Sequence, residues 1–144
     1  MFFKHQDGCL SGTMSGLLRF LLPIVVATLS VSAAPEPIST SDPGARHAAD
    51  FAMQVHNELS KNEYAFRIIR IESASFEMFP PSRVEYFLTA EVGRTVCRNE
   101  QGLNPSGCAL QSGADAKTVV CRFVVLAVPN SSVPSHLLED QCQE

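Results

Sequence analysis

Residues 84–92 read Val-Glu-Tyr-Phe-Leu-Thr-Ala-Glu-Val. Apolar or aromatic side chains stand at every second position, a period of two that predicts a strand with one buried face. A second strand is predicted at residues 118–128, Thr-Val-Val-Cys-Arg-Phe-Val-Val-Leu-Ala-Val, and a short last strand at residues 133–142. Upstream, residues 64–71 form a β-prone run that must end before Pro80-Pro81-Ser82, because a strand interior does not tolerate two prolines.

A helix is predicted ahead of these strands, over residues 43–59. Asp42 can cap the free N–H groups of its first turn, and Pro43 suits the first helical position, where its missing N–H needs no partner. Apolar residues then recur at spacings of three and four and predict one buried stripe, formed by Ala48, Phe51, Ala52, Val55 and Leu59. One helix followed by strands without a βαβ crossover predicts an α+β fold, with one long helix packed across an antiparallel sheet of four to five strands.

The N-terminal part of the chain has the composition of a targeting segment. An apolar run at residues 17–31 is followed by Ser32-Ala33-Ala34 and then by a Pro-rich polar stretch. This pattern predicts a signal peptide over residues 1–33, a flexible trunk over residues 34–41 and one folded domain over residues 42–144. The alternative, a membrane anchor, needs roughly 20 apolar residues, so we expect a secreted, extracellular protein that is free of the membrane after processing. Translation from Met14 in place of Met1 would give a more compact leader.

Charge and residue spacing argue against several classes of function. The net charge is −4 and no basic patch is apparent, which argues against binding to nucleic acid or to an anionic membrane. No Ser/His/Asp or paired-carboxylate motif is present, so we expect neither an enzyme nor a cofactor. The four histidines are scattered and no CxxC pair occurs, so no metal site is predicted.

The cysteines point to an oxidising compartment. Cys9 lies in the predicted leader, and the mature chain keeps four: Cys97, Cys108, Cys121 and Cys142. Four cysteines in so short a secreted chain predict two disulfides, and three pairings are open from the count alone.

Several short stretches carry a family resemblance. Asp42-Pro43-Gly44 leads into the predicted helix, and Tyr86-Phe87-Leu88 is followed by Glu-Val-Gly-Arg-Thr-Val-Cys at residues 91–97. Together with the C-x10-C and C-x20-C spacings, these residues resemble the secreted type 2 cystatins, inhibitors of papain-like cysteine proteases. The resemblance covers nearly all of the mature chain. It implies a cystatin-like fold with a short strand before the helix, and disulfides that join Cys97 to Cys108 and Cys121 to Cys142.

The resemblance also implies which segments would contact a protease. Cystatins plug the active-site cleft without covalent chemistry, using an N-terminal trunk and two hairpin loops at one end of the sheet. The first loop falls on Glu77, Met78, Phe79, Pro80 and Pro81. Here Glu77 and Pro81 replace the Gln and Gly of the family pattern Q-x-V-x-G, and the trunk lacks the family's Gly hinge.

The second loop falls on Val128, Pro129 and Asn130, where Asn130 replaces a Trp of the family and the chain contains no Trp. Loss of such an anchor costs about 2 kcal/mol or more, on the order of thirtyfold in affinity. The resemblance therefore implies an inhibitor of cathepsins that is weak or of altered specificity, with Met78 and Phe79 supplying an apolar wedge.

Two asparagines have separate implications. Asn130-Ser131-Ser132 is an N-glycosylation sequon on the second loop. Asn62 follows the predicted helix, where some type 2 cystatins present an Asn to the Asn-cleaving protease legumain; an ordinary turn residue is the alternative. Two other readings stay open, namely a cystatin-fold extracellular binding module that inhibits nothing, and a domain-swapped dimer in place of the expected monomer.

Overall fold

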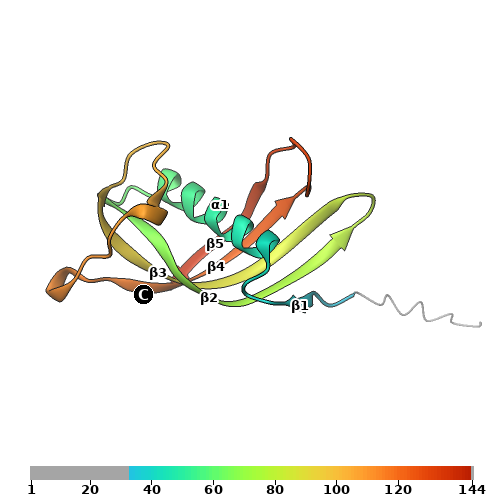
Figure 1. Cartoon of the computed structure of the whole chain (residues 1–144), viewed down its shortest axis with the longest axis horizontal. Helices are drawn as coiled ribbons and strands as arrows, with labels where there is room; N and C mark the ends of the chain where they lie inside the picture. The colour runs from blue at the N-terminus through green and yellow to red at the C-terminus, as the bar shows by residue number, and fades with distance from the viewer. Residues whose placement is uncertain (1–32, 144) are drawn as a thin grey trace, which may run out of the picture. The chain divides into compact units, whose positions relative to one another are not determined.

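The computed structural model describes residues 33–143, so the predicted signal peptide lies outside the described residues except for Ala33. This part of the chain forms β1 (Glu36–Ile38), α1 (Pro43–Leu59), β2 (Tyr64–Phe79), β3 (Arg83–Arg98), β4 (Thr118–Ala127) and β5 (His136–Gln143). The strands form one antiparallel sheet in the order β1-β2-β3-β4-β5, and α1 lies across one face of it (Figure 1). The predicted α+β fold is confirmed.

The central strand β3 has the predicted alternation. Val84, Leu88, Ala90 and Val92 are buried, whereas the residues between them are half-buried. β3 pairs with β2 on one side and with β4 on the other, and it continues past the predicted segment to Arg98. Main-chain pairing with β3 therefore fixes the positions of β2 and β4 along most of their length. The loops that leave these strands at each end of the sheet consequently have defined positions.

β1 lies inside the segment that we expected to be a flexible trunk. Its three residues pair with Ala74, Ser75 and Phe76 of β2, and Ile38 packs against the core. Three residues are too few to show a period of two, so only the family resemblance implied this strand. Pro37 is compatible with it because β1 is an edge strand, where a missing N–H can face away from the sheet.

The helix begins at the predicted residue, and the carboxylate Oδ1 of Asp42 accepts a hydrogen bond of 2.9 Å from the N–H of Ala45. Its buried face, however, is rotated from the predicted stripe. The buried apolar side chains are small or flexible ones that pack on the sheet: Ala45, Ala48, Ala49, Ala52 and Met53. Alanines let the helix approach the strands closely, and Asn57 near the end of the helix is buried as well. Leu59 was wrongly assigned to the stripe, since it is 72% exposed.

The long connection between β3 and β4 contains two 3₁₀ turns, η2 (Pro105–Gly107) and η3 (Gly113–Asp115). A β-bridge between Thr95 and Leu110 and main-chain hydrogen bonds of Arg94 and Val96 hold it against β3. The disulfides are Cys97–Cys108, which closes the first part of this connection, and Cys121–Cys142, which joins β4 to β5. The pairing implied by the resemblance is confirmed. Within residues 33–143, no helix is long and apolar enough to cross a membrane.

Candidate functional site

Three segments meet at one end of the sheet. The β2–β3 turn and the β4–β5 connection both project from the end where β1 pairs, and the β3–β4 connection lies at the other end (Figure 1). The strand register explains this, because Phe79 pairs with Arg83 at the tip of the first hairpin and Ala127 pairs with Val84 beside it. We call this end, formed by β1, residues 77–83 and residues 128–135, the loop end.

The β2–β3 hairpin is paired almost to its tip, which leaves Pro80, Pro81 and Ser82 as the turn. Three of the five residues expected in this loop, Glu77, Met78 and Phe79, therefore lie in β2. Met78 is 65% exposed and Phe79 is 37% exposed. Two large apolar side chains thus stand next to a turn made mostly of proline, and both are available for contact with another protein.

Glu77 lies directly opposite Glu85 in the same hairpin. Like charges at facing positions repel one another and weaken strand pairing. The hairpin therefore carries two facing carboxylates next to its apolar tip, with the exposed Arg83 two residues from Glu85, and Glu77 stands where the family pattern has a neutral Gln. A partner that binds this end has to accommodate two carboxylates as well as the apolar side chains.

The second loop, between β4 and β5, is held by its own serine. The hydroxyl of Ser131 donates to the carbonyl of Val128 at 2.8 Å and accepts from the N–H of Val133 at 3.2 Å. Asn130 is exposed and has a φ of 56°, in the left-handed region that asparagine tolerates better than most residues. Val128 is half-buried, whereas Pro129 and Val133 are exposed, so this loop also offers apolar surface.

A cavity of about 310 Å³ lies between the second loop and the start of α1. Its lining includes Gly44, His47, Tyr86, Val128 and Asn130. The hydroxyl of Tyr86 lies so close to Gly44 that a Cβ at this position would overlap it. Burial, and then the nearby Asp42 carboxylate, raise the pKa of the Tyr86 phenol. Gly44 is therefore needed for the close approach of the helix start to β3, which positions the loop end.

Asn62 is separated from these residues. It lies exposed in the connection between α1 and β2, at the end of the sheet opposite the loop end. Its carbonyl accepts a hydrogen bond of 3.2 Å from Nδ2 of Asn99. The predicted site residues thus fall into two groups on opposite ends of the domain.

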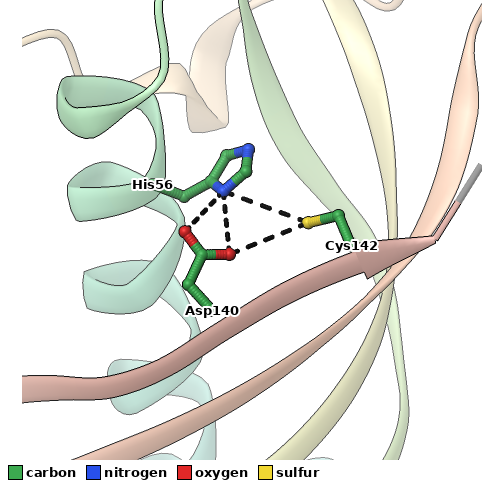
Figure 2. Close-up of side chains that lie close together, drawn as sticks. All are labelled: His56, Asp140 and Cys142. Atoms are coloured by element: carbon green, nitrogen blue, oxygen red, sulfur yellow. Dashed lines mark hydrogen bonds and ion pairs between the residues drawn. The ribbon is translucent and has the colours of Figure 1, made fainter.

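One cluster has no counterpart in the sequence interpretation. Nδ1 of His56 lies 2.9 Å and 2.8 Å from the two carboxylate oxygens of Asp140, and the Sγ of Cys142 lies 3.9 Å from the same nitrogen (Figure 2). The imidazole also meets the rings of Phe66 and Phe123 edge-on. No spacing rule could connect His56 with Asp140, because they are 84 residues apart.

These three side chains offer donor atoms close enough together to be tested as a metal site. The sulfur of Cys142 is bonded to Cys121, which leaves His56 and Asp140 as ligands, whereas structural and catalytic zinc sites use three or four protein ligands. The geometry fits a link between α1 and the edge strand β5 better than an ion site.

Comparisons with known proteins agree with this architecture. A family model described as the cystatin domain matches residues 33–130. Cystatin from Gallus gallus is 34% identical over 111 residues, which is 76% of this chain and 77% of the relative. A cystatin from Austrelaps superbus is 32% identical over 118 residues, covering 78% and 82% of the two chains.

Solved structures show the same fold. The structure of dimeric human cystatin F superposes with a TM-score of 0.68 at 26% identity, covering 80% of this chain and 92% of that chain. Mouse fetuin-B in its complex with crayfish astacin also has a TM-score of 0.68, at 19% identity, and covers 76% of this chain and 35% of that chain. At that identity the likeness to fetuin-B concerns the fold alone. The chain belongs to the cystatin family, whose members are protease inhibitors and not enzymes.

Proposed function

We propose that the protein is a secreted inhibitor of papain-like cysteine proteases that occludes the active-site cleft non-covalently with its loop end. The observation that supports this most is the meeting of β1, the β2–β3 turn and the β4–β5 loop at one end of a rigid sheet. Exposed apolar side chains gather there, with Met78 65% and Val133 51% exposed. A protruding apolar edge of this kind suits insertion into an apolar cleft.

The contacts would differ from the family pattern. Met78 and Phe79 would supply most of the apolar area, because Asn130 offers a polar side chain where the family has Trp. The carboxylates of Glu77 and Glu85 favour a protease whose cleft rim is basic, because like charges across an interface cost affinity. We therefore propose weak inhibition of typical cathepsins and a preference for targets with positive charge beside the cleft.

The test is a titration of the protein against a cathepsin L-like protease, with the inhibition constant as readout. Met78→Ala combined with Phe79→Ala should raise this constant at least tenfold. Val96→Ala is the matched control, because Val96 is 56% exposed on β3 near Cys97, away from the loop end. Equal inhibition by the double variant would refute the proposed contacts. No inhibition by the wild type would instead support the non-inhibitory binding module.

Exposure of Asn62 at the other end of the domain supports a second candidate, inhibition of legumain. This enzyme cleaves after Asn, so a held, accessible Asn can occupy its specificity pocket. Asn62→Ala should abolish inhibition of legumain and leave any inhibition of a cathepsin unchanged. Gln101→Ala is the control, because Gln101 is an exposed amide that lines the same surface hollow. Inhibition that survives Asn62→Ala would exclude this candidate.

We also propose that the chain is processed after Ala33, glycosylated at Asn130 and secreted as a monomer. The two disulfides and the exposure of Asn130 support this. Mass spectrometry of protein secreted by animal cells should give an N-terminus at Ala34 and a mass that falls on treatment with an N-glycosidase. Size-exclusion chromatography distinguishes the monomer from a domain-swapped dimer.

A further inference from the structure

A groove of about 380 Å³ lies along the outer edge of β2, on the part of the domain that the protease contacts do not use. The residues of β2 that line it are consecutive, 67–71, which means that the strand presents its main-chain edge to the groove as well as side chains. One wall comes from α1, with Arg46, Asp50 and Met53, and the other from the β3–β4 connection at residues 104–106.

This edge is covered at both ends and open between them. β1 pairs only with Ala74 to Phe76, and the side-chain amide of Asn57 bonds both main-chain groups of Phe66. Between these points the pairing of β2 with β3 shifts twice, which leaves Ile69 and Glu72 without a partner on β3. Such bulges blunt an edge against pairing with a further strand. A compact ligand therefore fits the groove better than an extended peptide.

Two guanidinium groups at the groove have no partner among residues 33–143. The Nε of Arg67 is buried and makes no hydrogen bond, and among the described residues no hydrogen bond or ion pair engages the side chain of Arg46. Arg70 differs, because its guanidinium contacts Glu91 at 2.6 Å and Glu72 at 3.2 Å. A buried donor without a partner costs roughly 1–3 kcal/mol, so the Nε of the half-buried Arg67 is a donor that a ligand could satisfy.

The donor set indicates the kind of ligand. Guanidinium groups bind the oxygens of sulfate and phosphate in a bidentate manner. Asp50 would repel a bare anion, but its carboxylate can accept hydrogen bonds from hydroxyl groups, and Thr40 and Ser106 offer hydroxyls in the same groove. The volume falls in the range of small-molecule sites and is larger than one anion requires. We infer that this groove binds a sugar carrying a sulfate or phosphate ester, with Arg67 and Arg46 on the ester and Asp50 on the sugar hydroxyls.

Isothermal titration of the protein, expressed from the full chain in animal cells, tests this with four probes: glucosamine 6-sulfate, glucose 6-phosphate, glucose and inorganic sulfate. At least one sugar ester should bind, and glucose and inorganic sulfate should bind at least tenfold more weakly. Tighter binding of glucosamine 6-sulfate would indicate a sulfated glycan as the natural ligand, and tighter binding of glucose 6-phosphate would indicate a sugar phosphate. Equal binding of inorganic sulfate, or no binding of either ester, would overturn the inference.

Variants locate the site. Arg67→Gln and Arg46→Gln should each weaken binding of the ester at least tenfold. Asp50→Asn should weaken binding of the ester and strengthen binding of inorganic sulfate. Arg122→Gln is the matched control, an exposed arginine on β4 that does not line the groove. Arg46 is on the exposed face of α1, so its replacement tests the site even if loss of Arg67 perturbs folding. Unchanged affinity in both arginine variants would contradict the assignment.

Discussion

The side chain of Asn57 pairs with the main chain of Phe66 as a neighbouring strand would. Its Nδ2 donates to the carbonyl of Phe66 at 2.8 Å, and its Oδ1 accepts from the N–H of Phe66 at 2.9 Å. Asn57 is buried in the last turns of α1, and its own carbonyl accepts from Nδ2 of Asn99 at 2.7 Å. One side-chain amide thus joins the helix to β2 and occupies the main-chain groups of Phe66 at the outer edge of the sheet.

We predict that Asn57→Ala lowers the free energy of unfolding by about 2–4 kcal/mol. The substitution leaves one buried donor and one buried acceptor of Phe66 unpaired, each costing about 1–3 kcal/mol. Equilibrium unfolding in urea measures the effect. Gln54→Ala removes an exposed amide from the same helix and should change stability by about 0.5 kcal/mol or less. Similar small losses in both variants would show that the pairing contributes little.

The phenol of Tyr86 should make stability fall at alkaline pH. Its pKa is raised in the folded protein by burial and then by the Asp42 carboxylate, so the native state keeps a proton that the unfolded chain loses near pH 10. This contribution is complete below the unfolded pKa and disappears as pH rises through the folded pKa. Urea unfolding at a series of pH values from about 8 to 11 should show the decline.

Tyr86→Phe should flatten this alkaline decline. Tyr64→Phe is the control, because Tyr64 is the second tyrosine of the chain, and this variant should keep the pH dependence of the wild type. In Tyr64→Phe, where Tyr86 is the one tyrosine left in a chain without Trp, absorbance at the phenolate band follows the ionisation of Tyr86. A decline that persists in Tyr86→Phe would assign it to other groups.

The pair formed by His56 and Asp140 should hold β5 against the helix. Asp140→Ala removes the contact, and since both side chains are partly buried we expect a loss of about 1 kcal/mol. Amide hydrogen exchange should become faster in β5 and stay unchanged in β3, because the Cys121–Cys142 disulfide still joins β5 to β4. Glu139→Ala, an exposed neighbour on the same strand, should leave exchange as in the wild type. Uniformly faster exchange in all strands would argue against a local role.

The sequence predicted those elements whose signals lie within a few neighbouring residues. Asp42 and Pro43 mark the helix start through main-chain chemistry within three residues, and the alternation at residues 84–92 follows directly from burial of one strand face. Leu59 was misplaced because periodicity alone does not tell where a helix leaves the sheet. Met78 and Phe79 were expected in a loop because the length of pairing in a hairpin depends on both strands.

The pairs that join distant segments had no sequence signal. His56 meets Asp140 only after β5 has paired with β4, and Arg46 and Arg67 share a groove only because α1 crosses β2. The sequence shows no run of basic residues, yet the fold brings Arg46 and Arg67 to one groove. Sites assembled from single residues on several elements depend on topology, which composition and spacing do not record.

Restoring the missing aromatic anchor should strengthen inhibition. Asn130 is exposed at the loop end beside Pro129, so Asn130→Trp places a large apolar side chain where the family has one. An anchor of this kind contributes about 2 kcal/mol, which predicts inhibition of a cathepsin L-like protease on the order of thirtyfold tighter. The substitution also removes the sequon, so Asn130→Gln serves as the control that loses the sequon without gaining an aromatic ring. If Asn130→Gln gives the whole increase, the glycan limits access to the cleft. If neither variant changes the inhibition constant, the second loop does not contact the protease.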